Sequence, residues 1–320
     1  MRDHVLIVGC GMMGSGIAAM SALAGHKTIL YDVDQTHAAN GRKRVESCID
    51  IRVKNGLNSE EEGERAKNLL KENVNLENAC SMASLVIEAI IEQLEVKQEM
   101  FAKLDELLPS EVPICSNTSG LRITDISKKC LHPERTVTTH FWLPAHLVPL
   151  VEVVMGDRSD QNVAVKVRDE LRKWKKAPVL VHRDLPGQLA NRIFQAIIRE
   201  SIDIVASGLA SAEDVDTAIS CGMAMRFPVW GPLMHLDDIG LKLGMDVQDS
   251  VLPSICADRQ ANPYLRDLVD SGNLGAKTGK GFYDWSKVDV KKCEEKRDQF
   301  IINAVKIKTR LDENIDISKH

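Results

Sequence analysis

The chain has 320 residues, of which 44% are apolar and 27% charged, a composition typical of soluble globular proteins with two domains. Its net charge of −5 lacks the basic excess that attracts nucleic acids and anionic membranes, so we expect neither as a partner. The eight cysteines show no metal-binding spacing, and we find no signal peptide or membrane-spanning run, so we expect no metal site and a cytoplasmic location.

The first elements predict a βαβ unit. A short buried strand is expected at 4–8, a helix at 15–24 and a second strand at 28–31. An apolar strand followed at once by glycines and a helix is the opening of a dinucleotide-binding fold.

The sequence between the first strand and the helix is GCGMMG, which has the G-x-G-x-x-G spacing of that fold. Gly9 allows the tight turn, Gly11 lets a pyrophosphate approach the backbone, and Gly14 lets the helix pack on the strand. Met12 and Met13 would present their amides to the phosphates at the positive end of the helix. Glycines also serve as plain turns, but here the strand and the helix both stand where the motif requires them.

Asp32 ends the second strand, eighteen residues after Gly14. A carboxylate at this position accepts hydrogen bonds from the adenine ribose and repels a 2′-phosphate. The sequence therefore predicts NAD rather than NADP as the cofactor.

A helical hairpin is predicted over 36–72, with its turn at Asn55-Gly56 and with Asn58 or Ser59 capping the second helix. The alternation of strands and helices then resumes, with strands expected at 84–90, 113–117, 135–141, 150–155 and 178–182 and a helix at 94–108. We therefore expect an α/β Rossmann-type domain with a helical hairpin insertion over 1–184.

The segment after 184 is predicted to be all α. The helix expected at 188–207 carries apolar residues on nearly every side, which favours burial in a core and against a second subunit. Further helices extend to about 272, and a Gly/Lys-rich turn and a charged helix over 287–312 follow. We expect residues 185–320 to form a helical domain for dimerisation and substrate binding, and the protein to be a homodimer.

His140 and Glu152 lie in two apolar strands joined by a loop at 143–149. If these strands pair in antiparallel fashion, the two residues stand directly opposite each other. A histidine in an apolar strand is most often a hydrogen-bonded core residue, so the pairing by itself leaves the role of His140 open.

The chain resembles the L-3-hydroxyacyl-CoA dehydrogenase family over nearly its whole length. The resemblance is carried, in family order, by VGCGMMGSGIA, LVIEAIIEQLEVKQEMF, CSNTSGLRITDI, HFWLPAHLVPLVEVV, DLPGQLANRIF, SAEDVDTAISCG and GAKTGKGFYDW. It implies an N-terminal NAD-binding domain, a helical C-terminal domain that forms the dimer, and a site between them.

The resemblance also implies roles for single residues. His140 and Glu152 match the catalytic pair of the family. In that pair a histidine moves the proton, because imidazole titrates near neutral pH, and a carboxylate orients the histidine ring. Ser119 matches the serine that hydrogen-bonds the reacting oxygen, although a turn or cap serine is the alternative. Asn191 matches an asparagine that the second domain points into the cleft.

Glu92, Lys97 and Lys277 match contacts on the nicotinamide or ribose side of the cofactor. Each of them could equally be a solvated surface charge.

The chain departs from the acyl-CoA enzymes at Leu143, where they have asparagine. The GMAMRFPVWGPL segment and the tail are closer to the branch containing lambda-crystallin (L-gulonate 3-dehydrogenase), L-carnitine dehydrogenase and a dehydrogenase of pyridoxine breakdown. In that segment Arg226 is a candidate for binding a substrate carboxylate, and a surface or ion-paired arginine is the alternative. Against this branch, Ser47 and Lys54 resemble the family's CoA-contacting pair.

Three functions remain open. The first is an NAD-dependent oxidoreductase that interconverts a 3-hydroxy acid, free or as a CoA thioester, and its 3-keto form. The second is a true short-chain L-3-hydroxyacyl-CoA (3-hydroxybutyryl-CoA) dehydrogenase. The third is a non-catalytic, NAD-binding structural protein of the crystallin kind, which would not need four polar groups converging on one cleft.

Overall fold

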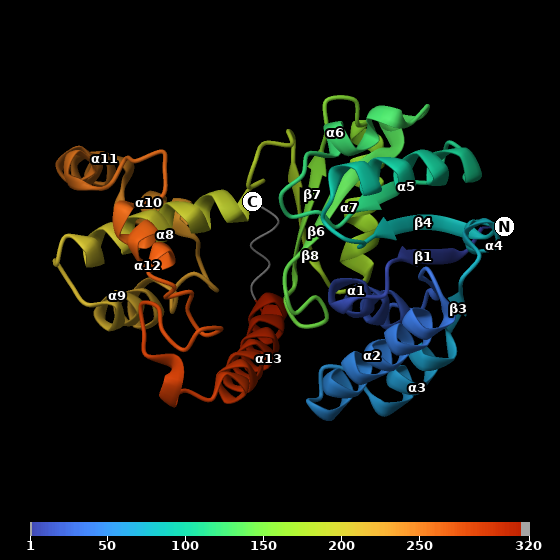
Figure 1. The fold of residues 1–320 in the computed structure, drawn as a ribbon, viewed down its shortest axis with the longest axis horizontal. Coiled ribbons are helices and arrows are strands. Elements are labelled where there is room, and N and C mark those ends of the chain that lie inside the picture. The colour runs from blue at the N-terminus through green and yellow to red at the C-terminus, as the bar shows by residue number, and fades with distance from the viewer. Residues whose placement is uncertain (1, 315–320) are drawn as a thin grey trace. The chain divides into compact units, whose positions relative to one another are not determined.

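The computed structural model describes residues 2–314 and divides the chain into two compact units (Figure 1). The first is built on the residues up to Ala190 together with Ile301–Lys306. The second is built on Asn191–Phe300 and the residues from Ile307 onward.

An eight-stranded sheet forms the centre of the first unit, in the order β3-β2-β1-β4-β5-β6-β7-β8. Neighbouring strands are parallel except β6 and β7, which are antiparallel. This mostly parallel sheet confirms the predicted Rossmann-type fold. The strands are β1 (His4–Val8), β2 (Lys27–Tyr31), β3 (Leu70–Asn73), β4 (Ala83–Glu88), β5 (Ile114–Ser116), β6 (Thr136–Phe141), β7 (Leu150–Met155) and β8 (Ala177–Val181).

Helices cover both faces of this sheet, and each face has its own apolar core, because a parallel sheet must bury both sides. One core joins the sheet to α1 (Met12–Leu23), α2 (Gln35–Lys54) and α7 (Gln161–Lys173). The other joins it to α4 (Leu76–Cys80), α5 (Leu94–Leu107) and α6 (Ile123–Ile126).

The predicted helical hairpin is present as α2 and α3 (Glu60–Asn68). Gly56 takes a φ of 66° in the turn, a left-handed conformation that favours glycine. The Ser59 hydroxyl accepts a hydrogen bond from the Glu62 amide, and the Glu62 carboxylate accepts one from the Ser59 amide, which forms a capping box.

Several features of this unit differ from the prediction or were not predicted, among them the short helices α4 and α6. β3 has the polar sequence LKEN and pairs only with β2 at the sheet edge, so it lacks the apolar pattern that identifies a strand. α7 was not predicted, although its apolar residues face the core. α1 begins at Met12 rather than at residue 15, so its first turn lies inside the glycine motif.

The second unit is helical, as predicted. Its helices are α8 (Ala190–Ala206), α9 (Ala212–Ala218), α10 (Pro232–Ile239), α11 (Leu241–Val251), α12 (Pro263–Asp270) and α13 (Val290–Asn314), apart from Ile301–Lys306 of α13, which belong to the first unit. Within one chain, Ile202 is the single buried residue of α8, so the predicted burial of this helix on several sides is not found in the isolated chain. In the described part of the chain, no helix is both long and apolar enough to cross a membrane.

Candidate active site

His140 and Glu152 are directly opposite each other in the antiparallel β6–β7 pair, as the sequence predicted. The Nδ1 atom of His140 lies 2.7 Å from Oε2 of Glu152. His140 is 6% exposed and Glu152 is fully buried, so solvent does not weaken this contact.

Glu152 accepts four hydrogen bonds. Its Oε2 atom takes those of His140 Nδ1 and, at 3.1 Å, of Trp142 Nε1. Its Oε1 atom takes those of the Leu189 and Ala190 backbone amides, both at 2.9 Å. Ala190 begins α8, so the positive end of that helix meets the carboxylate.

These contacts keep the carboxyl group of Glu152 in its ionised form. Burial on its own would raise the pKa of this carboxyl, but the hydrogen bonds from His140, Ala190, Trp142 and Leu189 outweigh it and lower the pKa to about 2. An ionised carboxylate can only accept hydrogen bonds, so Nδ1 of His140 must carry the hydrogen. This leaves Nε2 as the ring nitrogen that can take up or release a proton.

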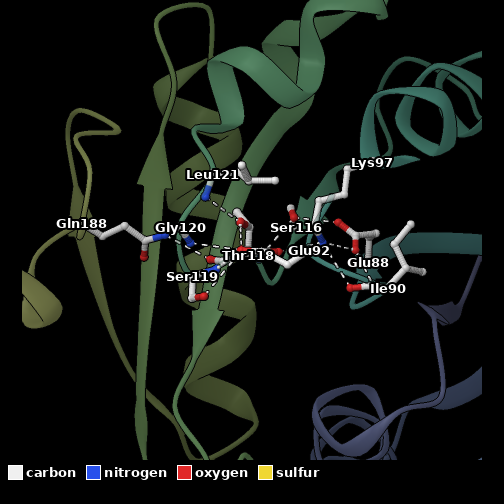
Figure 2. A network of polar contacts seen from close by, with 10 residues as sticks. All are labelled: Glu88, Ile90, Glu92, Lys97, Ser116, Thr118, Ser119, Gly120, Leu121 and Gln188. Carbon is white, nitrogen blue, oxygen red and sulfur yellow. Dashed lines mark hydrogen bonds and ion pairs between the residues drawn. The ribbon is translucent and has the colours of Figure 1, made fainter. Parts of the chain in front are cut away.

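The loop that follows β5 is held by Glu92, whose Oε1 atom accepts several hydrogen bonds at once (Figure 2). The donors are the Thr118 hydroxyl at 2.6 Å, the Ser119 amide at 3.0 Å and the Gly120 amide at 3.1 Å. Ser119 is exposed, and its hydroxyl lies 3.5 Å from the same oxygen. Glu92 thus orients the loop that carries Ser119.

Lys97 is 1% exposed and lies beside Glu88 and Glu92, so it is not the solvated surface charge that was the alternative (Figure 2). Its Nζ atom is 2.6 Å from Oε1 of Glu88 and 3.3 Å from Oε2 of Glu92. Glu88, at the end of β4, also accepts a hydrogen bond from Ser116. Sequence analysis missed Glu88, although an acid that ends an apolar strand could have indicated it.

The packing of the protein requires glycine at two of the three positions of the motif. Gly9 has a φ of 98°, and a Cβ atom there would meet the Ala89 carbonyl oxygen at 2.8 Å. A Cβ atom on Gly14 would lie 1.9 Å from the Gly9 oxygen, so only glycine fits. At Gly11 a Cβ atom would meet nothing within 4 Å, so the protein itself does not require glycine there, but a bound pyrophosphate would. No side chain caps the N-terminus of α1, which leaves the first-turn amides of Met12 and Met13 for the phosphates.

Asp32 follows β2 and is half-buried. Its Oδ2 atom accepts a hydrogen bond from the Cys10 amide at 2.8 Å, and Oδ1 accepts one from the Val33 amide at 2.8 Å. The carboxylate is thus fixed beside the glycine loop, where it would repel a 2′-phosphate.

The remaining predicted site residues belong to the second unit. Asn191 is half-buried in the first turn of α8, next in the chain to Ala190. Arg226 and Lys277 are exposed, and neither forms an ion pair with any side chain that the structure describes. The alternative that Arg226 pairs with a nearby aspartate is therefore not found.

Two further residues connect the parts of the site and were missed from the sequence. Trp142 stands two residues after His140, and that spacing could have indicated a side chain on the same face. The Gln188 side-chain amide donates to the Thr118 carbonyl at 3.1 Å. No local pattern indicates this contact, because seventy residues separate its partners.

The chain matches two family models. Residues 4–185 match the NAD-binding domain of 3-hydroxyacyl-CoA dehydrogenase, and residues 187–285 match its C-terminal domain.

Relatives with different names match most of the chain. A probable 3-hydroxybutyryl-CoA dehydrogenase of Bacillus subtilis is 36% identical over 286 residues, or 89% of this chain and 98% of that protein. A 5-formyl-3-hydroxy-2-methylpyridine 4-carboxylate 5-dehydrogenase of Mesorhizobium japonicum is 27% identical over 307 residues, or 96% and 98%.

Solved structures show the same two kinds of relative. A crystal structure of the pyridine-carboxylate 5-dehydrogenase, described as an NAD⁺-dependent dismutase, superposes with a TM-score of 0.86 at 28% identity, covering 97% of this chain and 99% of that one. An (S)-3-hydroxybutyryl-CoA dehydrogenase from Ralstonia eutropha gives a TM-score of 0.73 at 29% identity, covering 90% and 100%. From the matched domains, the relatives and the glycine loop it follows that this chain belongs to the 3-hydroxyacyl-CoA dehydrogenase family and is an NAD-dependent oxidoreductase acting on a CH–OH group.

Proposed function

We propose that His140 is the general base of this oxidoreductase and that Glu152 orients it. In the oxidative direction Nε2 of His140 takes the proton of the substrate hydroxyl, and Nδ1 keeps its hydrogen bond to Glu152. Bound NAD would accept the hydride from the carbon that carries this hydroxyl. The observation that carries this proposal is the fourfold hydrogen bonding of Glu152, which keeps a negative charge beside the imidazolium as it forms.

We also propose roles for the other polar residues. Ser119 and Asn191 would hydrogen-bond the reacting oxygen, and Arg226 would bind a carboxylate of the substrate. Gly9, Gly11, Met12, Met13, Gly14 and Asp32 would hold the cofactor, with Glu92 and Lys277 at its nicotinamide or ribose side. Lys97, which is buried, would act through Glu92.

For the substrate we propose a small hydroxy acid without CoA. The structure superposes on the pyridine-carboxylate enzyme with a TM-score of 0.86 over 97% of this chain, whereas the 3-hydroxybutyryl-CoA enzyme gives 0.73 over 90%. The second candidate is a hydroxyacyl-CoA thioester, which is supported by the 36% identity to the Bacillus subtilis protein and by the exposure of Ser47 and Lys54 on α2.

We further propose that the protein is a cytoplasmic homodimer, with residues 1–184 as the NAD-binding domain and 185–320 as the domain for dimerisation and substrate binding. The cytoplasmic location is supported by eight cysteines that form no disulfide in the structure, five of which are half-buried or more deeply covered in the first unit.

A substrate panel tests the proposed chemistry. Purified protein is assayed for NADH formation or consumption with the pyridine carboxylate of the Mesorhizobium japonicum enzyme, carnitine, gulonate, 3-hydroxybutyrate and acetoacetyl-CoA. We expect turnover of a free acid, and we expect His140→Gln to lower kcat about a hundredfold or more with NAD binding unchanged. His132→Gln is the matched control, because His132 also pairs with a glutamate, Glu134 at 3.0 Å, but on the surface. If His140→Gln behaves like the control, His140 is a core residue and not the base.

A further inference from the structure

Gln188 occupies an unusual position for a long polar side chain. It is 7% exposed, and its φ of 50° lies in the left-handed region that non-glycine residues rarely adopt. It follows Gly187, whose φ is 78°, so two successive residues turn the chain immediately before α8. Strain of this kind persists where the surroundings hold a residue in place.

Those surroundings are the two halves of the candidate active site. The Nε2 atom of Gln188 donates to the Thr118 carbonyl, next to Ser119, and Figure 2 shows the side chain reaching to that loop. The next two backbone amides, of Leu189 and Ala190, bind Glu152. Gln188 therefore lies between the Ser119 loop and the residue that orients His140.

The other end of the same amide has no partner in the described part of the chain. Oε1 of Gln188 is buried, and no donor among the described backbone and side-chain groups reaches it. A buried acceptor without a donor is costly, and nearly all such groups in proteins find one. Because Nε2 is fixed on Thr118, the amide cannot rotate to satisfy Oε1 without losing that bond.

We propose that Oε1 of Gln188 accepts a hydrogen bond from a second donor of the substrate, a hydroxyl or N–H group other than the hydroxyl that is oxidised. The substrate class would then be small hydroxy acids, or the corresponding carbonyl acids, that carry an additional donor. This inference rests on the proposed function, because it adds a contact to the same site. An acceptor built into a site favours ligands that bring the matching donor and rejects analogues that lack it.

The test compares substrates that differ by one hydroxyl group. The first pair is 3,4-dihydroxybutyrate and 3-hydroxybutyrate. The second is 5-formyl-3-hydroxy-2-methylpyridine 4-carboxylate and the same compound without the ring hydroxyl. Acetoacetyl-CoA, which has no second donor near its reacting carbon, completes the set. For the wild type we expect kcat/KM to favour the member with the additional hydroxyl group tenfold or more in at least one pair.

Two variants separate the ends of the amide. Gln188→Met removes both the donor and the acceptor, and we expect it to abolish the preference for the member with the additional hydroxyl group. Gln188→Glu keeps an acceptor oxygen and loses the donor to Thr118, and we expect it to retain the preference. Gln98→Met is the matched control, because Gln98 also donates to a backbone carbonyl, that of Asp125 at 2.8 Å, and we expect it to keep the wild-type ratio. Fluorescence titration with NADH and thermal unfolding check that each variant is folded.

The remaining outcomes overturn the inference in distinguishable ways. Equal wild-type rates within every pair, or an equal loss on both members in Gln188→Met, would mean that Gln188 only supports the Ser119 loop. The wild-type comparison stands even if a variant fails to fold. Turnover of acetoacetyl-CoA alone would overturn the inference and the free-acid proposal, but not the role of His140. No turnover of any compound would count against the proposed substrates themselves.

Discussion

Glu152 illustrates how a single side chain is set by its neighbours. Its four donors are the ring of its strand partner, an indole two residues after that partner, and two backbone amides at the start of α8, those of Leu189 just before the helix and of Ala190. Protein groups thus occupy both carboxylate oxygens, which supports the proposed role of Glu152 in orienting His140. Trp142 also contacts the histidine, because its ring centroid lies 5.8 Å from that of His140.

At the scale of the residue, we predict that Glu152→Gln lowers the free energy of unfolding by an amount that depends on pH. The native pKa is lowered to about 2, so the carboxylate contributes stability that is complete above its usual pKa and is lost as the pH falls toward about 2. The free energy of unfolding of the variant should therefore fall furthest below that of the wild type at neutral pH, and the two should converge at acid pH. Urea denaturation from pH 7 to pH 3 measures this. Glu134→Gln, at an exposed His–Glu pair, should show no such convergence, and parallel curves for Glu152→Gln would refute the prediction.

Among the elements, the loop between β6 and β7 decides whether His140 and Glu152 meet. Two basic side chains donate hydrogen bonds to its backbone carbonyls. Nζ of Lys176 donates to Ala145 at 2.5 Å and to Val148 at 2.8 Å, and Nη1 of Arg52 donates to His146 at 2.6 Å. Lys176 also stands 5.7 Å from the centre of the Phe141 ring. The loop is thus held from the hairpin insertion and from the start of β8.

Lys176 should make stability rise with pH. Burial, and then the charge of Arg52, lower its pKa to about 7, so between about pH 7 and its usual pKa the unfolded chain holds a proton that the native protein has released. The free energy of unfolding contributed by this group therefore increases as the pH rises through that window. We expect the wild type to gain stability from pH 7 to pH 9.5 relative to Lys176→Met. Lys175→Met, at the exposed neighbouring lysine, should follow the wild type, and the prediction is wrong if both variants do.

At the scale of the whole molecule, the second unit buries little of its apolar surface within one chain. Ile193 of α8 is 54% exposed, and α8, α9 and the turn after α9 line an apolar groove of about 780 Å³. Apolar surface of this extent in a folded protein marks an interface. A second copy of the chain is the partner that we propose.

The mass in solution tests the dimer. Light scattering at micromolar concentration should give twice the single-chain mass of 35.5 kDa. Ile193→Asp should shift the mass toward the single chain, because a charge in an apolar interface loses its hydration. Leu131→Asp, at an exposed leucine of the first unit, should leave the dimer intact. A single-chain mass for the wild type would contradict the proposal.

The sequence by itself determined the features that depend on residues close together in the chain. The glycine loop, the hairpin turn with a cap at Asn58 or Ser59 and the His140–Glu152 register all follow from local spacing and from the period of a strand, and the structure assigns the cap to Ser59. Only the tertiary structure decided that Lys97 is buried against Glu88, that the Leu189 and Ala190 amides bind Glu152 and that Gln188 reaches Thr118. These contacts join segments that no periodic pattern relates, because their geometry is set by how the helices and strands pack and not by the order of neighbouring residues.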